Sequence, residues 1–169
     1  KKLSGLEMKV LACDPVVGEE LMAAHGVKPV GLDELLQTSD YVSLHTPLTD
    51  ETYHLIGERE LRMCKPKSVL INTARGKVID ELSLVQALEE GWIAAAALDV
   101  LEQEPTPADN PLLRFDNVVV TPHIAGISDE SYDLVRNHSL DCLIALSQKR
   151  WPPWCANPEV EPRWTLGRD

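Results

Sequence analysis

Three side chains suited to acid–base or anion-binding chemistry each follow a different short apolar run. Arg75 comes directly after "INTA", Glu104 lies in "DVLEQEP" and His123 lies in "TPHIAG". An arginine binds a carboxylate through two parallel hydrogen bonds, and a histidine exchanges a proton near neutral pH. A carboxylate beside an imidazole orients the ring and stabilises its protonated form. The three residue types therefore suit proton transfer to a substrate held by its carboxylate.

Each of these residues also has a plainer interpretation when taken alone. Arg75 could pair at the surface with Asp80 or Glu81, and His123 could be an ordinary loop histidine. Glu104 is one of 27 acidic residues, so a solvated loop carboxylate is its simplest reading. The combination favours a specific reaction, in which a nicotinamide exchanges hydride with carbon 2 of a 2-oxo or 2-hydroxy acid. Arg75 would hold the carboxylate of the acid, and His123 would give or take the proton on the 2-oxygen. Glu104 would orient the imidazole and stabilise its protonated form.

The elements that must position these residues alternate between apolar runs and helical stretches. Near-continuous apolar runs separated by helices favour a parallel sheet covered on both faces. Right-handed crossovers place the carboxyl ends of such strands at one edge, where ligands bind. The fold class expected is therefore α/β, a doubly wound parallel sheet. The strands are expected at 8–13, 41–45, 68–74, 92–100 and 117–123.

Four shorter helices are predicted between these runs. Gly26 follows the first in the position of a helix C-cap. The last has Asp80 near its N-terminus, and Leu82, Val85 and Leu88 form its expected apolar stripe. The helices are expected within 17–26, 32–39, 57–65 and 80–91.

The character of the chain changes after Gly126. The stretch 128–150 predicts one long helix with Ser128 or Asp129 as its N-cap. The tail 151–169 contains four prolines and three of the four tryptophans, so it cannot form a regular helix. We expect a nucleotide-binding part over 1–127 and a returning helix and tail over 128–169.

Composition narrows the classes of partner. The chain has 169 residues and a net charge of −11, which opposes binding to nucleic acid. No apolar run reaches the roughly 18 residues that a membrane span needs. The four cysteines form no C-x-x-C pair and no cysteine–histidine cluster with zinc spacing, so no metal site is predicted. Reduced thiols in a cytoplasmic protein are the simplest interpretation.

Two long motifs then carry a family resemblance. "INTARGKVIDELSLVQALEEGWIAAAALDVLEQEP" and "NVVVTPHIAG" closely resemble the D-isomer-specific 2-hydroxyacid dehydrogenases, which include phosphoglycerate dehydrogenases and glyoxylate and hydroxypyruvate reductases. The resemblance extends from about Leu3 to Val160, including "HTPLTDETYHLIG" and "NPEV". It implies that Arg75, Glu104 and His123 are the catalytic set.

The resemblance also implies NAD as the cofactor. Asp14 matches the acid that binds the adenosine ribose, which favours NAD over NADP because it would repel a 2′-phosphate. Asp99 matches the acid that bonds the nicotinamide carboxamide. Taken alone, Asp14 could be a turn residue before Pro15, and Asp99 a polar strand cap. The other implied contacts are Thr46, Pro47, Thr73, Ala74, Arg75, His123, Ala125 and Gly126.

One feature of the family is missing from this sequence. The family has a substrate domain, a first strand and a "G-x-G-x-x-G" loop before the strand that ends in Asp14, and the 13 residues before Asp14 contain only Gly5. We therefore expect an N-terminally truncated chain with an incomplete sheet, weak NAD binding at most, and a C-terminal helix that would pack on the missing domain. The family tendency implies a homodimer. A non-catalytic NAD-sensing or partner-binding module, resembling a co-repressor, and an inactive fragment are the alternatives.

Overall fold

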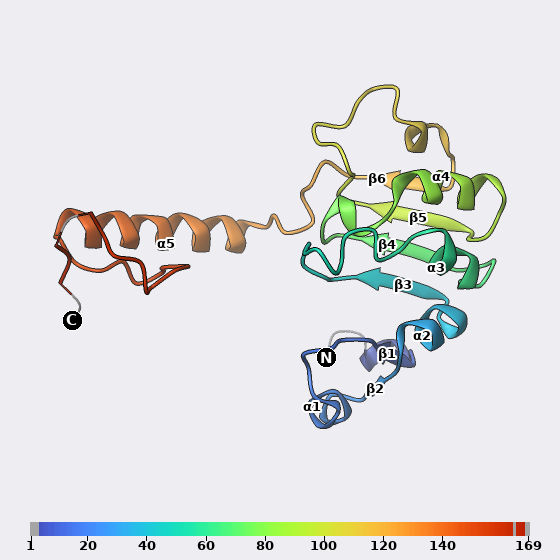
Figure 1. The fold of residues 1–169 in the computed structure, drawn as a ribbon, viewed down its shortest axis with the longest axis horizontal. Coiled ribbons are helices and arrows are strands. Elements are labelled where there is room, and N and C mark those ends of the chain that lie inside the picture. The colour runs from blue at the N-terminus through green and yellow to red at the C-terminus, as the bar shows by residue number, and fades with distance from the viewer. Residues whose placement is uncertain (1–3, 164, 168–169) are drawn as a thin grey trace. The chain divides into compact units, whose positions relative to one another are not determined.

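The computed structural model describes residues 4–163 and 165–167. The chain divides into two compact units, 1–125 and 126–169. Figure 1 shows the strands and most of the helices in the first unit, and one long helix in the second.

The strands of the first unit are all parallel and form two sheets. A two-stranded sheet pairs β1 with β2, and a four-stranded sheet has the order β3-β4-β5-β6 (Figure 1). Helices alternate with the strands, which confirms the α/β, Rossmann-like class. The strands are β1 Val10–Ala12, β2 Val27–Pro29, β3 Tyr41–Leu44, β4 Val69–Asn72, β5 Ala95–Leu98 and β6 Val118–Val120.

The sheet is interrupted between β1 and β3, which do not pair with each other in the described chain. The two sheets are therefore described separately, as β1-β2 and β3-β4-β5-β6.

The four predicted helices are present. Gly26 follows α1 with a φ of +70°, in the left-handed region that a helix C-cap glycine favours. The strand β2 was not predicted, because its three residues end in Pro29 and lie between turn-forming glycines. The helices are α1 Glu19–Ala24, α2 Leu32–Thr38, α3 Glu58–Met63 and α4 Glu81–Glu89, with short 3₁₀ helices η1 Ser4–Leu6, η2 Gly76–Val78 and η3 Pro111–Arg114.

The predicted apolar stripe of α4 is wrong at one position. Leu82 is 80% exposed, whereas Leu84, Ala87 and Leu88 are buried. Leucines at both 82 and 84 offer two overlapping stripes, so spacing alone does not select the buried face. The side chain of Asp80 caps the helix by accepting the Leu82 N–H, which places Leu82 in the exposed first turn.

The core lies between the four-stranded sheet and the helices α2, α3 and α4. The two sides of the sheet differ in burial. Residues of β3 alternate between exposed and buried, and those of β4 and β5 between half-buried and buried. The expectation that both faces of the strands are covered is therefore wrong for β3, and also for β6, where Val119 is 63% exposed. The fully buried side chains of this core include Leu36, Ile56, Leu61, Leu70, Leu84 and Leu112.

The second unit consists of α5, Asp129–Ser147, and an irregular tail. Ser128, one of the two residues expected as its N-cap, occupies that position and exchanges hydrogen bonds with Ser131. The described part of the tail contains no helix, and it returns to form a bridge between Arg150 and Gly167. Of the helices in the described residues, none has the length and apolar character that crossing a membrane requires.

Candidate active site

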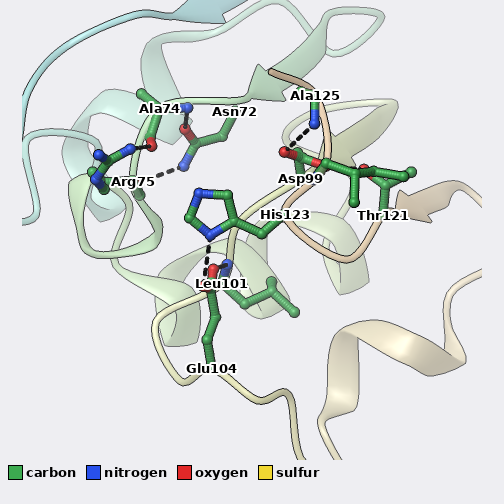
Figure 2. Close-up of polar contacts among 10 residues, drawn as sticks. Asn72, Ala74, Arg75, Asp99, Leu101, Glu104, Thr121, His123 and Ala125 are labelled. Carbon is green, nitrogen blue, oxygen red and sulfur yellow. Dashed lines mark hydrogen bonds and ion pairs between the residues drawn. The ribbon is translucent and has the colours of Figure 1, made fainter. Parts of the chain in front are cut away.

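The turn after β4 carries Arg75. Hydrogen bonds with the side chain of Asn72, the last residue of the strand, hold this turn. Asn72 is fully buried, its Nδ2 donates to the Arg75 carbonyl at 2.9 Å, and its Oδ1 accepts the Ala74 N–H at 3.0 Å (Figure 2). A buried amide with both ends satisfied fixes the turn. Asn72 was not predicted as a site residue, although it stands in the "INTARG" motif.

Gly76 brings this turn against the loop that follows β5. A Cβ on Gly76 would lie 1.9 Å from the carbonyl oxygen of Leu101 and 2.6 Å from the Glu102 nitrogen. Only glycine allows the two backbones to approach this closely. The approach joins the segment that carries Arg75 to the segment that carries Glu104.

Glu104 and His123 are in direct contact. His123 Nδ1 lies 2.8 Å from Glu104 Oε2, and Glu104 Oε1 accepts the Leu101 N–H at 3.1 Å (Figure 2). The hydrogen bond with His123 is the main reason that the pKa of Glu104 lies below its ordinary value. The Leu101 N–H adds to the effect, while partial burial and the nearby Asp99 oppose it. The carboxylate is therefore charged and oriented beside the imidazole.

The backbone of His123 adopts an unusual conformation. Its φ is +55°, in the left-handed region that non-glycine residues rarely occupy. The His123 N–H donates to the Asp99 carbonyl at 2.8 Å and is also 3.0 Å from the Thr121 carbonyl. Such strain persists where the surroundings over-determine it, often at functional sites.

Asp99 organises the loop around His123. Its side chain accepts hydrogen bonds from the Thr121 hydroxyl at 2.5 Å and from the N–H groups of Ile124 and Ala125 at 2.9 and 2.8 Å. Burial raises the pKa of Asp99, but these hydrogen bonds and the nearby His123 outweigh burial, so the pKa is lowered. The predicted site residues Asp99 and Ala125 thus bind each other, and Thr121 belongs to the same cluster although it was not predicted from sequence.

Arg75 is exposed and stands apart from the Glu104–His123 pair. Its Nη1 donates to the Ala74 carbonyl at 2.6 Å, and among the described residues it forms no ion pair with Asp80 or Glu81. Figure 2 shows its guanidinium beside the β4 turn, on the other side of the ring of His123 from Asp99. The surface ion pair considered from sequence is therefore absent, and the guanidinium remains available to an anion.

An open pocket of about 520 Å³ lies between the carboxyl ends of β3 and β4. It brings together the predicted cofactor-contacting residues Thr46, Pro47, Thr73, Ala74 and Arg75. His45 and Leu48, which were not predicted, also line it, and His45 Nε2 lies 2.9 Å from the Ser43 hydroxyl.

Asp14 lies just beyond β1 and is exposed. Its Oδ1 accepts the N–H groups of Val16 and Val17 at 2.8 and 3.1 Å, and these bonds lower its pKa. Within the described chain Oδ2 carries no hydrogen bond. Asp14 therefore caps a turn, as its plainer interpretation held, and retains a free oxygen for a hydroxyl donor. Gly126 begins the second unit, where its carbonyl accepts a hydrogen bond from the Ser131 hydroxyl.

The family model for the NAD-binding domain of the D-isomer-specific 2-hydroxyacid dehydrogenases matches residues 1–125. The chain belongs to this family. The match covers all the strands and every predicted site residue except Gly126.

Relatives and solved structures of this family agree with the assignment. The chain is 47% identical to a glyoxylate reductase of Korarchaeum cryptofilum over 160 residues, which are 95% of this chain and 48% of the relative. It is 48% identical to a D-3-phosphoglycerate dehydrogenase of Archaeoglobus fulgidus over 131 residues, 78% of this chain and 25% of the relative. The chain thus spans about half the length of the glyoxylate reductases that it matches.

Among solved structures, a D-lactate dehydrogenase of Lactobacillus jensenii with NAD+ has a TM-score of 0.82 and 34% identity. The match covers 92% of this chain and 50% of that one. A D-lactate dehydrogenase of Aquifex aeolicus complexed with NAD and lactic acid has a TM-score of 0.77 and 37% identity, covering 85% and 47%. The cofactor of this dehydrogenase family is therefore NAD, as the sequence predicted.

Proposed function

We propose that the protein to which this chain belongs interconverts a D-2-hydroxy acid and a 2-oxo acid by hydride exchange with NAD. The observation that carries the proposal is the 2.8 Å contact between His123 and Glu104 at adjoining strand ends. A glyoxylate- or hydroxypyruvate-sized 2-oxo acid is the proposed substrate, in line with the named relatives.

In this mechanism His123 is the acid and base at the substrate 2-oxygen. Its Nδ1 is engaged by Glu104, which leaves Nε2 to give a proton during reduction and to take one during oxidation. Glu104 holds the ring orientation and stabilises the protonated imidazole electrostatically. Arg75 binds the substrate carboxylate. Among the described residues its guanidinium donates only to the Ala74 carbonyl, which leaves most of its five N–H donors free.

The residues that would hold NAD fit its chemistry. The pocket formed by residues 45–48 and 73–75 lies at the carboxyl edge of the sheet, where dinucleotides bind in such folds. The free Oδ2 of Asp14 can accept a ribose hydroxyl, and the lowered pKa keeps this carboxylate charged. When bound, NAD would supply the hydride exchange at carbon 2.

The proposal is tested by turnover in the complete protein. With NADH and either glyoxylate or hydroxypyruvate, we expect 2-oxo acid reduction, followed as loss of NADH absorbance. His123→Ala should lower kcat by roughly 10²–10⁴-fold, the usual contribution of general acid–base catalysis. His25→Ala, which changes an exposed histidine at the end of α1, is the control and should retain activity. Absence of turnover with every 2-oxo acid would overturn the proposal and favour an NAD-sensing binding module.

We further infer a division of the protein in which 1–127 binds NAD and α5 with its tail packs on a substrate domain. Exposed apolar side chains on α5 support this inference because such surfaces usually meet a partner. They are Tyr132, Leu134, Val135, Leu140, Leu143 and Ile144. Removing this surface by Leu143→Ser in the complete protein should lower its melting temperature, whereas Asp141→Ser, an exposed neighbour, should not.

We also infer a cytoplasmic homodimer that does not bind nucleic acid or membranes. All four cysteines are free, which suits a reducing compartment. The acidic net charge opposes binding to a phosphate backbone. Light scattering during gel filtration of the complete protein would give the dimer mass, and a monomer mass would contradict the inference.

A further inference from the structure

Two acidic residues join the start of α4 to the turn that carries Glu104. The Glu81 N–H donates to Glu102 Oε1 at 2.9 Å, and the Glu102 N–H donates to Glu81 Oε2 at 2.9 Å. Each carboxylate thus accepts the backbone N–H of the other residue, across 21 positions of sequence. We call this reciprocal pair of hydrogen bonds the Glu81–Glu102 latch.

Further contacts complete the latch. The second oxygen of Glu81 accepts a hydrogen bond of 2.6 Å from the Asn110 amide, and Asn110 is buried. His54 Nε2 lies 3.0 Å from Glu102 Oε1, in a contact too poorly aligned for a hydrogen bond. The α4 N-terminus carries a partial positive charge. These donors and charges offset the repulsion between two half-buried carboxylates, so the arrangement is strongly specified.

The latch acts on the residue that orients Glu104. Glu102 directly follows Leu101, whose carbonyl lies against Gly76 and whose N–H donates to Glu104 Oε1. Fixing the Glu102 backbone therefore fixes the Leu101 peptide, and through it the carboxylate that faces His123. None of these contacts belongs to the substrate or NAD side of the proposed site.

The same region also contains three residues of metal-binding type, but their contacts do not favour a metal site. His54, Asp80 and Glu102 offer ligand atoms within 4.8 Å of one another. The two oxygens of Asp80, however, already accept hydrogen bonds from the Leu82 N–H and the Ser83 hydroxyl at the α4 N-terminus. The partial positive charge of that terminus opposes a cation. The carboxylates of Asp80 and Glu102 therefore accept hydrogen bonds from the protein itself.

We propose that Glu81 and Glu102 are positioning residues that set the Glu104–His123 pair for proton transfer. The proposal rests on the function proposed above. Its contacts are hydrogen bonds of defined reach, so the length of the side chain at position 102 matters more than its charge.

Two substitutions at position 102 of the complete protein separate the effect of side-chain length from the effect of side-chain charge. Glu102→Gln keeps an oxygen at the same reach without the charge, whereas Glu102→Asp keeps the charge and withdraws the oxygen by one methylene. Gln103→Ala changes an exposed side chain in the same turn and is the control. Turnover gives kcat and KM, and carbon-detected NMR follows the titration of the Glu104 carboxyl. Circular dichroism confirms that each variant is folded.

If the latch positions Glu104, Glu102→Asp should lower kcat by about tenfold. A small misplacement of a catalytic group has effects of this order or larger. The KM for NADH should remain near the wild-type value. The pKa of Glu104 should rise towards its ordinary value in this variant as the contact with His123 loosens. Glu102→Gln and Gln103→Ala should resemble the wild type in both measurements.

The outcomes distinguish the latch from the proposed reaction. Wild-type kcat and Glu104 titration in Glu102→Asp would overturn the latch, as would a larger effect from Glu102→Gln than from Glu102→Asp. If the wild type has no turnover, the dehydrogenase proposal fails, and the NMR titration alone still decides whether the latch positions Glu104.

Discussion

Glu104 Oε2 lies 2.8 Å from His123 Nδ1, although 19 positions separate the two residues in sequence. The contact joins the loop after β5 to the loop after β6. Further hydrogen bonds hold both residues in place. Leu101 holds the second oxygen of Glu104, and the backbone of His123 is bound to Asp99. Contacts within the chain thus hold the pair at the sheet edge, and such preorganisation of polar groups favours catalysis.

The first prediction concerns the pH dependence of this pair. Because the folded-state pKa of Glu104 is lowered, its contribution to stability is present above the ordinary value of about 4.5 and is lost as pH falls through the lowered pKa. Glu104→Gln should therefore reduce the free energy of unfolding at pH 7 by no more than about 1 kcal/mol, since the side chain is 38% exposed. Denaturant unfolding should show this difference disappearing at low pH, below the ordinary pKa of about 4.5. Glu89→Gln, on the exposed end of α4, should show no difference at either pH.

The second prediction concerns the contact beneath Arg75. Gly76→Ala would place a Cβ 1.9 Å from the Leu101 carbonyl oxygen, so a backbone must move. We expect a loss of more than about 3 kcal/mol in the free energy of unfolding, in the range of severe core overpacking. Gly31→Ala is the matched control, because its Cβ would meet open space at a φ of −71°, and should cost less than about 1 kcal/mol. Equal stability of the two variants would show that the backbones do not approach as described.

Much of the fold and of the candidate site followed from the sequence, because both depend on local signals. Continuous apolar runs identified five of the six strands, and the residues directly after them included Arg75, Glu104 and His123. The position of a residue after a strand is sufficient to predict which sheet edge it occupies.

What the sequence could not predict depends on contacts between distant segments. The Glu81–Glu102 latch and the cluster around Asp99 join residues 21 to 26 positions apart, and acidic residues are too common for their pairing to be inferred. The role of Gly76 needs the Leu101 backbone beside it. The strand β2 is too short to show a period, and it depends on pairing with β1.

The third prediction uses the two leucines of α4 that sequence periodicity could not separate. Leu84 is 1% exposed within the core, and Leu82 is 80% exposed. Leu84→Ala should lower the free energy of unfolding by about 2–5 kcal/mol, the cost of a buried leucine cavity. Leu82→Ala removes the same atoms from the same helix and should change it by less than about 0.5 kcal/mol. Thermal or denaturant unfolding of the two variants measures which face of α4 is buried, and the reverse order would restore the stripe expected from sequence.

The last prediction concerns the exposed guanidinium of Arg75. Its only hydrogen bond among the described residues is the one to the Ala74 carbonyl, so a substrate carboxylate would meet a planar group with free parallel donors. Arg75→Lys keeps the positive charge but loses this paired geometry, and an ammonium does not replace it. In the complete protein we expect kcat/KM for the 2-oxo acid to fall by about 100-fold, corresponding to about 2.7 kcal/mol, while the KM for NADH stays nearly unchanged.

Arg114→Lys, on the exposed end of η3, makes the same chemical change away from the site and should have no effect on either constant. A loss confined to the KM for NADH in Arg75→Lys would instead assign the guanidinium to the cofactor. Unchanged kinetics with both substrates would leave Arg75 as a surface arginine and remove it from the proposed mechanism.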